Sequence, residues 1–91
     1  MNAKKKQPDT RELTFYCDNA RHLVCEPYTI ENLHRCAQIL NIKKCWFHSS
    51  SKFKHYDIPK KRVTEITTRC HLVDTKMILA ITKGEHNNIL V

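Results

Sequence analysis

The chain has 91 residues, and its 16 Lys and Arg residues outnumber its 9 Asp and Glu residues to give a formal net charge of +7. This length allows one domain with a modest core, and a hydrophobic fraction of 41% argues against a disordered chain. No apolar run approaches the roughly 20 residues that span a bilayer, no secretory signal is recognisable, and a single glycine excludes the glycine-rich loops that cradle nucleotide phosphates.

The polarity of the two ends predicts how the chain is divided. Residues 1–11 are polar and basic without hydrophobic periodicity, so we expect a flexible basic tail. Residues 12–84 then form a single α/β domain, and residues 85–91 form a C-terminal tail.

The first half of the domain predicts a strand followed by a helix. Residues 13–17 are rich in β-branched and aromatic side chains, which favours a short buried strand. Residues 21–28 contain a proline and are expected to be a connection. Thr29 is a suitable cap for a helix over 30–40 with apolar residues at helical spacing, and Asn41 is a suitable left-handed terminator.

The second half predicts two further strand–helix units. Residues 44–48 favour a second strand, and Asp57 with the following Ile-Pro resembles the start of a helix that extends to Cys70. Residues 71–73 favour a third strand, and Asp74 is a suitable cap for a last helix that ends at the glycine.

This alternation predicts the fold class. Three strand–helix units with helical crossovers favour an α/β fold with a minimal three-stranded parallel sheet, Rossmann-like in its connections. In such sheets, ligands bind at the carboxyl ends of the strands.

The positive charge is concentrated in one segment. Residues 43–62 hold seven Lys and Arg residues and one Asp, a net charge of +6, and Phe53 and Tyr56 are interleaved with lysines there. Such a segment favours phosphate groups and stacking on bases, although a solvated face that only aids solubility has the same composition.

The predicted strand ends bring polar residues to this basic segment. We therefore expect a site for a phosphate-bearing ligand, either a nucleotide, a signalling nucleotide or a nucleic acid, at the carboxyl edge of the sheet, and no membrane partner. Its expected contacts come from the strand ends and the basic segment: Asp18, Arg21, His48, Lys52, Lys54, His55, Tyr56 and Arg62. This reading needs no cofactor.

A metal-dependent phosphodiesterase or nuclease is the alternative, and the sequence leaves open whether the protein is an enzyme. Asp18, Asp57 and Asp74 would then hold Mg²⁺ or Mn²⁺, with His48 or His55 as the base. Under this alternative the catalytic group is Asp18, His48, His55 and Asp57. Helix capping by Asp57 and Asp74 and packing by Tyr56 are the competing structural explanations.

The five cysteines include no C-x-x-C pair, and their odd number is unlike a secreted disulfide framework. We expect free thiols and a cytoplasmic protein. Cys17, His22 and Cys25 could supply three zinc ligands, but their spacing matches no standard site and we expect no structural zinc there.

The Trp46-Phe47-His48 block followed by His55-Tyr56-Asp57 resembles a family of small domains of unknown function from bacteria and their phages. The resemblance covers about residues 13–84. It implies a small intracellular α/β domain without an established activity, encoded by a phage and present in the host cytoplasm. Under the phosphate-binding hypothesis, such a phage protein would counter a host defence. An inhibitor that binds a host protein through its basic face is the third candidate.

Overall fold

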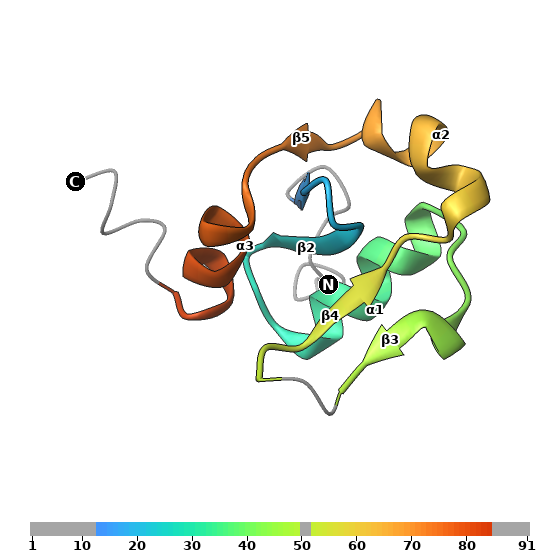
Figure 1. Cartoon of the computed structure of the whole chain (residues 1–91). Helices are drawn as coiled ribbons and strands as arrows, with labels where there is room; N and C mark the ends of the chain where they lie inside the picture. The colour runs from blue at the N-terminus through green and yellow to red at the C-terminus, as the bar shows by residue number, and fades with distance from the viewer. Residues whose placement is uncertain (1–12, 50–51, 85–91) are drawn as a thin grey trace.

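A computed structural model describes residues 13–49 and 52–84, which form a five-stranded sheet and three α-helices (Figure 1). Both tails expected at the ends of the chain lie outside the described residues. The strands are β1 Thr14–Cys17, β2 His22–Glu26, β3 Phe47–His48, β4 His55–Asp57 and β5 His71–Leu72. The helices are α1 Ile30–Ile39, α2 Val63–Thr67 and α3 Thr75–Thr82, with 3₁₀ turns at Lys44–Trp46 and Lys60–Arg62.

The predicted three-stranded parallel, Rossmann-like sheet is wrong, because the sheet is mixed. Its strand order is β3-β4-β2-β1-β5, only β1 and β5 pair in parallel, and the other neighbours are antiparallel. The main cause is the segment expected to be a connection, which forms β2 and turns back against β1. Asp18 makes this turn because its Oδ1 accepts the backbone N–H groups of Ala20 (3.0 Å) and His22 (2.9 Å). Arg21 completes the turn in the left-handed region, at φ 67°.

The second cause is β4, which lies inside the sheet between β3 and β2. The sequence predicted a loop and a helix start at this point, but Asp57 ends the strand and caps no helix. The strand predicted over 44–48 is a 3₁₀ turn that runs into the two residues of β3. The helix expected to reach Cys70 ends at Thr67, in a stretch where three threonines disfavour helix.

The predictions for the first and last helices are confirmed. Thr29 caps α1 by accepting the N–H of Asn32 (2.9 Å), and Asn41 follows the helix at φ 59°. Asp74 caps α3 by accepting the N–H of Met77 (2.9 Å), and Gly84 follows at φ 74°. No helix in residues 13–49 and 52–84 is long and apolar enough to cross a membrane.

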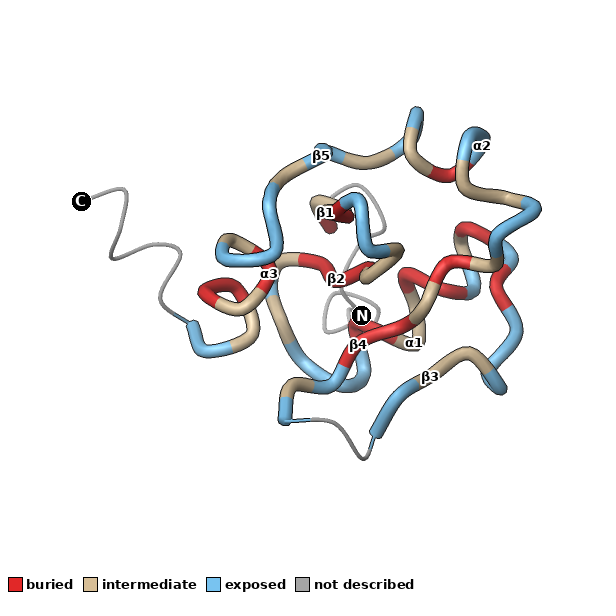
Figure 2. Tube along the Cα trace, viewed as in Figure 1, coloured by how far each residue is buried: buried red, intermediate tan, exposed pale blue. Residues whose placement is uncertain are grey.

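The core lies where α1 covers β2 and β4, and buried stretches run along all three elements (Figure 2). Strand alternation puts Leu23 and Tyr56 on the same face, because the two residues are register partners. The Tyr56 hydroxyl hydrogen-bonds to Nδ1 of His34 on α1 (2.7 Å), and both rings contact Phe47. This face of β3 and β4 is therefore packed, and the opposite face is left for polar side chains.

Candidate functional site

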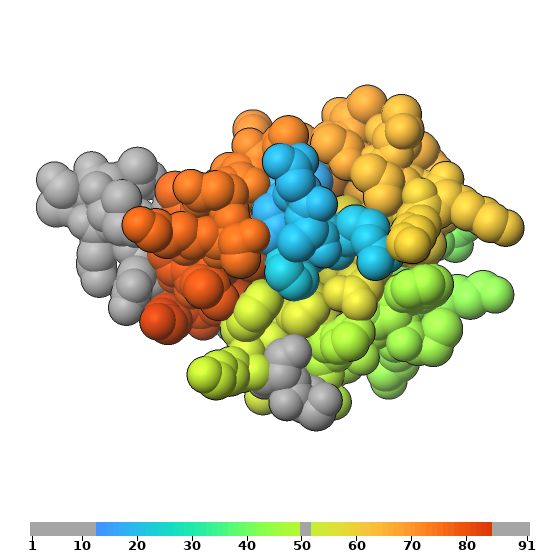
Figure 3. Space-filling model, in the orientation of Figure 1, coloured from blue at the N-terminus to red at the C-terminus, as the bar shows by residue number. Residues whose placement is uncertain are grey.

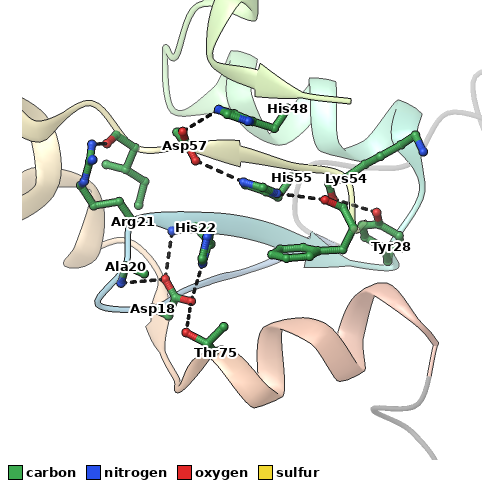
Figure 4. A network of polar contacts seen from close by, with 12 residues as sticks. Asp18, Ala20, Arg21, His22, Tyr28, His48, Lys54, His55, Asp57 and Thr75 are labelled. Atoms are coloured by element: carbon green, nitrogen blue, oxygen red, sulfur yellow. Dashed lines mark hydrogen bonds and ion pairs between the residues drawn. The ribbon is translucent and has the colours of Figure 1, made fainter. Parts of the chain in front are cut away.

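Strand register brings four polar side chains together on the face opposite α1. His48 of β3 is the register partner of His55 of β4, and His22 of β2 is the partner of Asp57. Residues His55 and Asp57 are two positions apart in one strand, so all four side chains leave the same face of the sheet. Figure 4 shows this polar network as two hydrogen-bonded groups, in which His48 and His55 contact Asp57 and His22 contacts Asp18.

His55 is the buried centre of this network. Its side chain is 5% exposed, and its ring stacks between Phe53, at a centroid distance of 4.6 Å, and His48, at 5.1 Å. Nδ1 lies 3.0 Å from the carbonyl oxygen of Phe53. Because a carbonyl oxygen can only accept, Nδ1 carries a proton, and the Nε2 atom is the one directed at Asp57.

The Asp57 carboxylate contacts both His48 and His55. His55 Nε2 lies 3.2 Å from Oδ1 of Asp57, and His48 Nε2 lies 2.7 Å from Oδ2. Nε2 of His55 and the carboxylate oxygen that it faces can share either a proton on Nε2 or a cation bound to both atoms.

One ligand atom from each of His48, His55 and Asp57 lies within 4.8 Å of the other two, and this is the only such group within residues 13–49 and 52–84. Two imidazoles and a carboxylate suit Zn²⁺ and similar transition metals, and three protein ligands leave a coordination position open. His48 and Asp57 are 48% and 27% exposed, so an ion and a ligand can reach this position from solvent. The hydrogen bond from Nδ1 to the Phe53 carbonyl orients the His55 ring as metal-binding histidines require.

A second pair, Asp18 and His22, lies beside this group. The Asp18 carboxylate is buried and accepts from four donors: two backbone N–H groups at Oδ1, and Nδ1 of His22 (2.8 Å) and the Thr75 hydroxyl (2.7 Å) at Oδ2. Burial raises the pKa of Asp18, but the hydrogen bonds from His22 and Thr75 outweigh it and hold this pKa below its ordinary value. The His22 ring meets the His55 ring edge-on, at a centroid distance of 4.8 Å.

The other expected site residues are distributed over three places. Arg21 donates from Nη1 to the carbonyl oxygen of Ile58 (3.0 Å) and lines a cavity with Trp46 and Pro59. Lys52 and Lys54 are exposed and line a separate groove with Phe53 and Tyr28. The backbone oxygen of Lys54 accepts from the Tyr28 hydroxyl (2.8 Å).

Tyr56, Arg62 and Asp74 do not join the network. Tyr56 is 2% exposed and packs in the core, which is the structural explanation that the sequence allowed in place of a ligand contact. Arg62 donates to the carbonyl oxygens of Leu40 and Asn41 just after α1 and pairs with Glu65. Asp74 caps α3, so the described residues do not gather Asp18, Asp57 and Asp74 into one group.

Sequence reasoning missed the roles of His22, Thr75 and Phe53. Asp18-Asn19 is a common turn sequence, and the apolar residues after it could have indicated a hairpin. That hairpin aligns His22 with Asp57. No local signal links Thr75 to Asp18, because 57 residues separate them in the chain.

The cysteines lie apart from this site. All five are free thiols, and Cys17, Cys25 and Cys36 are buried. His22 and Cys25 are three residues apart in β2, so they point to opposite faces and do not approach one metal together.

Comparison with known proteins gives a family. Residues 9–83 match the model of the family described as "Protein of unknown function (DUF4031)", and the chain belongs to this family. No curated protein and no solved structure matches the chain.

Proposed function

We propose that this family member binds a phosphate-bearing ligand through a divalent transition metal ion held by His48, His55 and Asp57. The observation that carries the proposal is the orientation of His55, whose Nδ1 is committed to the Phe53 carbonyl while its Nε2 faces the Asp57 carboxylate. A metal ion near these two atoms accepts both as ligands and takes a third from His48.

The net charge of the segment that carries the three metal ligands supports phosphate as the further ligand. Lys52, Lys54, Lys60 and Lys61 are all exposed, and residues 43–62 carry a net charge of +6. A divalent ion adds to this positive potential, and its open coordination position suits a phosphate oxygen. Nucleotides and nucleic acids both offer this group.

Calorimetric titration of the metal-free protein with Zn²⁺ and Mn²⁺ tests the metal site. We expect one ion per chain, and a loss of at least tenfold in affinity in Asp57→Asn and in His55→Gln. The matched control is His71→Gln, an exposed histidine on β5 outside the group. Equal affinity in all four proteins would contradict the proposal.

The phosphate part is tested separately with ADP in the presence and absence of the metal. Affinity for ADP should rise when the metal is bound and should fall with salt, because neutralised phosphates release counterions. Replacing Lys52, Lys54, Lys60 and Lys61 by Ser should weaken binding and flatten the salt dependence. If the metal leaves ADP affinity unchanged, the phosphate is not a metal ligand.

Metal-dependent phosphodiester hydrolysis is the second candidate. It is favoured by the open coordination position and by His22, whose ring is oriented by Asp18 next to the metal ligands. With bis(p-nitrophenyl) phosphate and Zn²⁺ or Mn²⁺, an enzyme releases p-nitrophenolate and loses this activity in Asp57→Asn. Metal and ADP binding without turnover of this or an oligonucleotide substrate would leave only the binding function.

A further inference from the structure

A cavity lined by Trp46 is formed by chain neighbours of the proposed metal ligands. It has a volume of about 540 Å³ and is lined mainly by apolar surface, from Arg21, Trp46, Pro59, Lys60 and Lys61. This volume lies within the range of small-molecule sites in proteins. In Figure 3, the segments near residues 20, 45 and 60 meet on the displayed face.

The chain neighbours of the metal ligands line this cavity. Trp46 ends the 3₁₀ turn two residues before His48, and Pro59 follows Asp57 by two residues. The β2–β4 pairing continues beyond His22 and Asp57 to Arg21 and Ile58, where the Ile58 N–H donates to the Arg21 carbonyl (2.9 Å). The cavity and the metal ligands therefore share the same three chain segments.

The residues of the lining combine an aromatic side chain with cationic ones. Trp46 is partly exposed and lines the cavity with Pro59. The apolar lining is completed by the alkyl chains of Arg21, Lys60 and Lys61, and the two lysines are exposed, so their charged ends can reach a ligand from solvent. A planar heteroaromatic group stacks on an indole, and phosphate oxygens pair with lysine and arginine. A nucleotide carries both groups a few bonds apart.

We infer that this cavity is a base-binding subsite and that the ligand of the proposed metal site is a free nucleotide. The base stacks on Trp46, and the phosphate lies between the metal and the cations of Arg21, Lys60 and Lys61. This inference rests on the proposed function for the phosphate, whereas the stacking on Trp46 is independent of the metal. The groove beside Phe53 is the weaker choice, because that ring already stacks on His55.

Tryptophan fluorescence tests the subsite directly, because Trp46 is the single tryptophan of the chain. We expect AMP to change the emission of the Zn²⁺-loaded protein, whereas ribose 5-phosphate leaves it almost unchanged. By calorimetry, AMP should bind roughly 5 to 150 times more tightly than ribose 5-phosphate, the factor that stacking of one base supplies.

Two variants separate the parts of the site. Trp46→Leu should remove the preference for AMP over ribose 5-phosphate and leave Zn²⁺ affinity unchanged, and Trp46→Phe should retain part of the preference. Replacing Lys60 and Lys61 by Ser should weaken the binding of AMP and of ribose 5-phosphate by the same factor. The wild-type ligand comparison needs no variant, so poor folding of Trp46→Leu would not prevent the test.

Equal affinity for AMP and ribose 5-phosphate, with unchanged emission, would overturn the subsite. Binding of an oligonucleotide such as dT₁₀ but not of AMP or GMP would overturn the choice of a free nucleotide. Failure of the metal site has a different signature: Zn²⁺ would not bind, while AMP would still change the emission in EDTA.

Discussion

Replacing Asp18 tests how the polar network is held in place. In Asp18→Asn, the remaining side-chain oxygen can still accept the N–H groups of Ala20 and His22. The new NH₂ group replaces Oδ2, to which both His22 Nδ1 and the Thr75 hydroxyl now donate. Two donors thus lose a charged acceptor.

The expected loss of stability follows from these contacts. A hydrogen bond to a charged group contributes about 1.5–3 kcal/mol. The Thr75 hydroxyl can rotate and accept from the new NH₂ group, which recovers part of the loss. We therefore expect Asp18→Asn to lower the free energy of unfolding by about 1–3 kcal/mol, and Asp18→Ala, which also removes the turn bonds, by more.

Urea unfolding followed by circular dichroism in EDTA measures this difference. The pKa of Asp18 is lowered from its ordinary value of 3.8, so its stabilisation is fully present above that value and is lost as the pH falls through the folded-state pKa. The difference in the free energy of unfolding between wild type and Asp18→Asn should therefore be at its full value at neutral pH and should decrease below pH 3.8. Asp74→Asn is the matched control, because asparagine is an equally good helix cap. A difference below about 0.5 kcal/mol at neutral pH would show that the Asp18 carboxylate does not stabilise the network through His22 and Thr75.

Two further predictions concern the scaffold. Thr29→Ala should lower the free energy of unfolding by about 1 kcal/mol, since it removes the acceptor for the Asn32 N–H. Thr29→Ser keeps a hydroxyl acceptor and should retain most of this stabilisation. With a thiol reagent, Cys45 should react first because it is exposed. The hydrogen bond from Cys70 lowers the pKa of Cys17 to about 7, but Cys17 is fully buried and should react only on unfolding. Rapid labelling of Cys17 in the native protein would contradict the packing around β1.

The sequence predicted those elements whose signals are local. Helices α1 and α3 were identified because a capping side chain, an apolar stripe and a left-handed or glycine terminator all lie within one segment. Strands β3, β4 and β5 have only two or three residues each, and their pairing depends on partners elsewhere in the chain. Local sequence patterns therefore predicted neither the mixed sheet nor the register of its strands.

The residues of the candidate site could also be predicted from local signals, whereas the way in which they come together could not. His48, His55 and Asp57 were singled out from residue type, and the structure brings them together. The reason is antiparallel register and not the carboxyl edge of a parallel sheet. Arg62 looked equally suitable in sequence, yet its guanidinium is occupied by the carbonyl oxygens that follow α1. Whether a basic side chain is available depends on contacts 21 and 22 residues away, which no local pattern reveals.

Neighbouring residues His55 and Tyr56 should therefore have separate roles, although both looked like ligand contacts in the sequence. Their side chains leave opposite faces of β4, and the Tyr56 hydroxyl bonds to His34 inside the core. Tyr56→Phe should lower the free energy of unfolding by about 1 kcal/mol and leave Zn²⁺ affinity unchanged. His55→Gln should lose the metal, and both changes are measured by titration and by urea unfolding of the same samples. If folded Tyr56→Phe loses Zn²⁺ affinity as His55→Gln does, the two faces of β4 are not independent, and the site extends into the core.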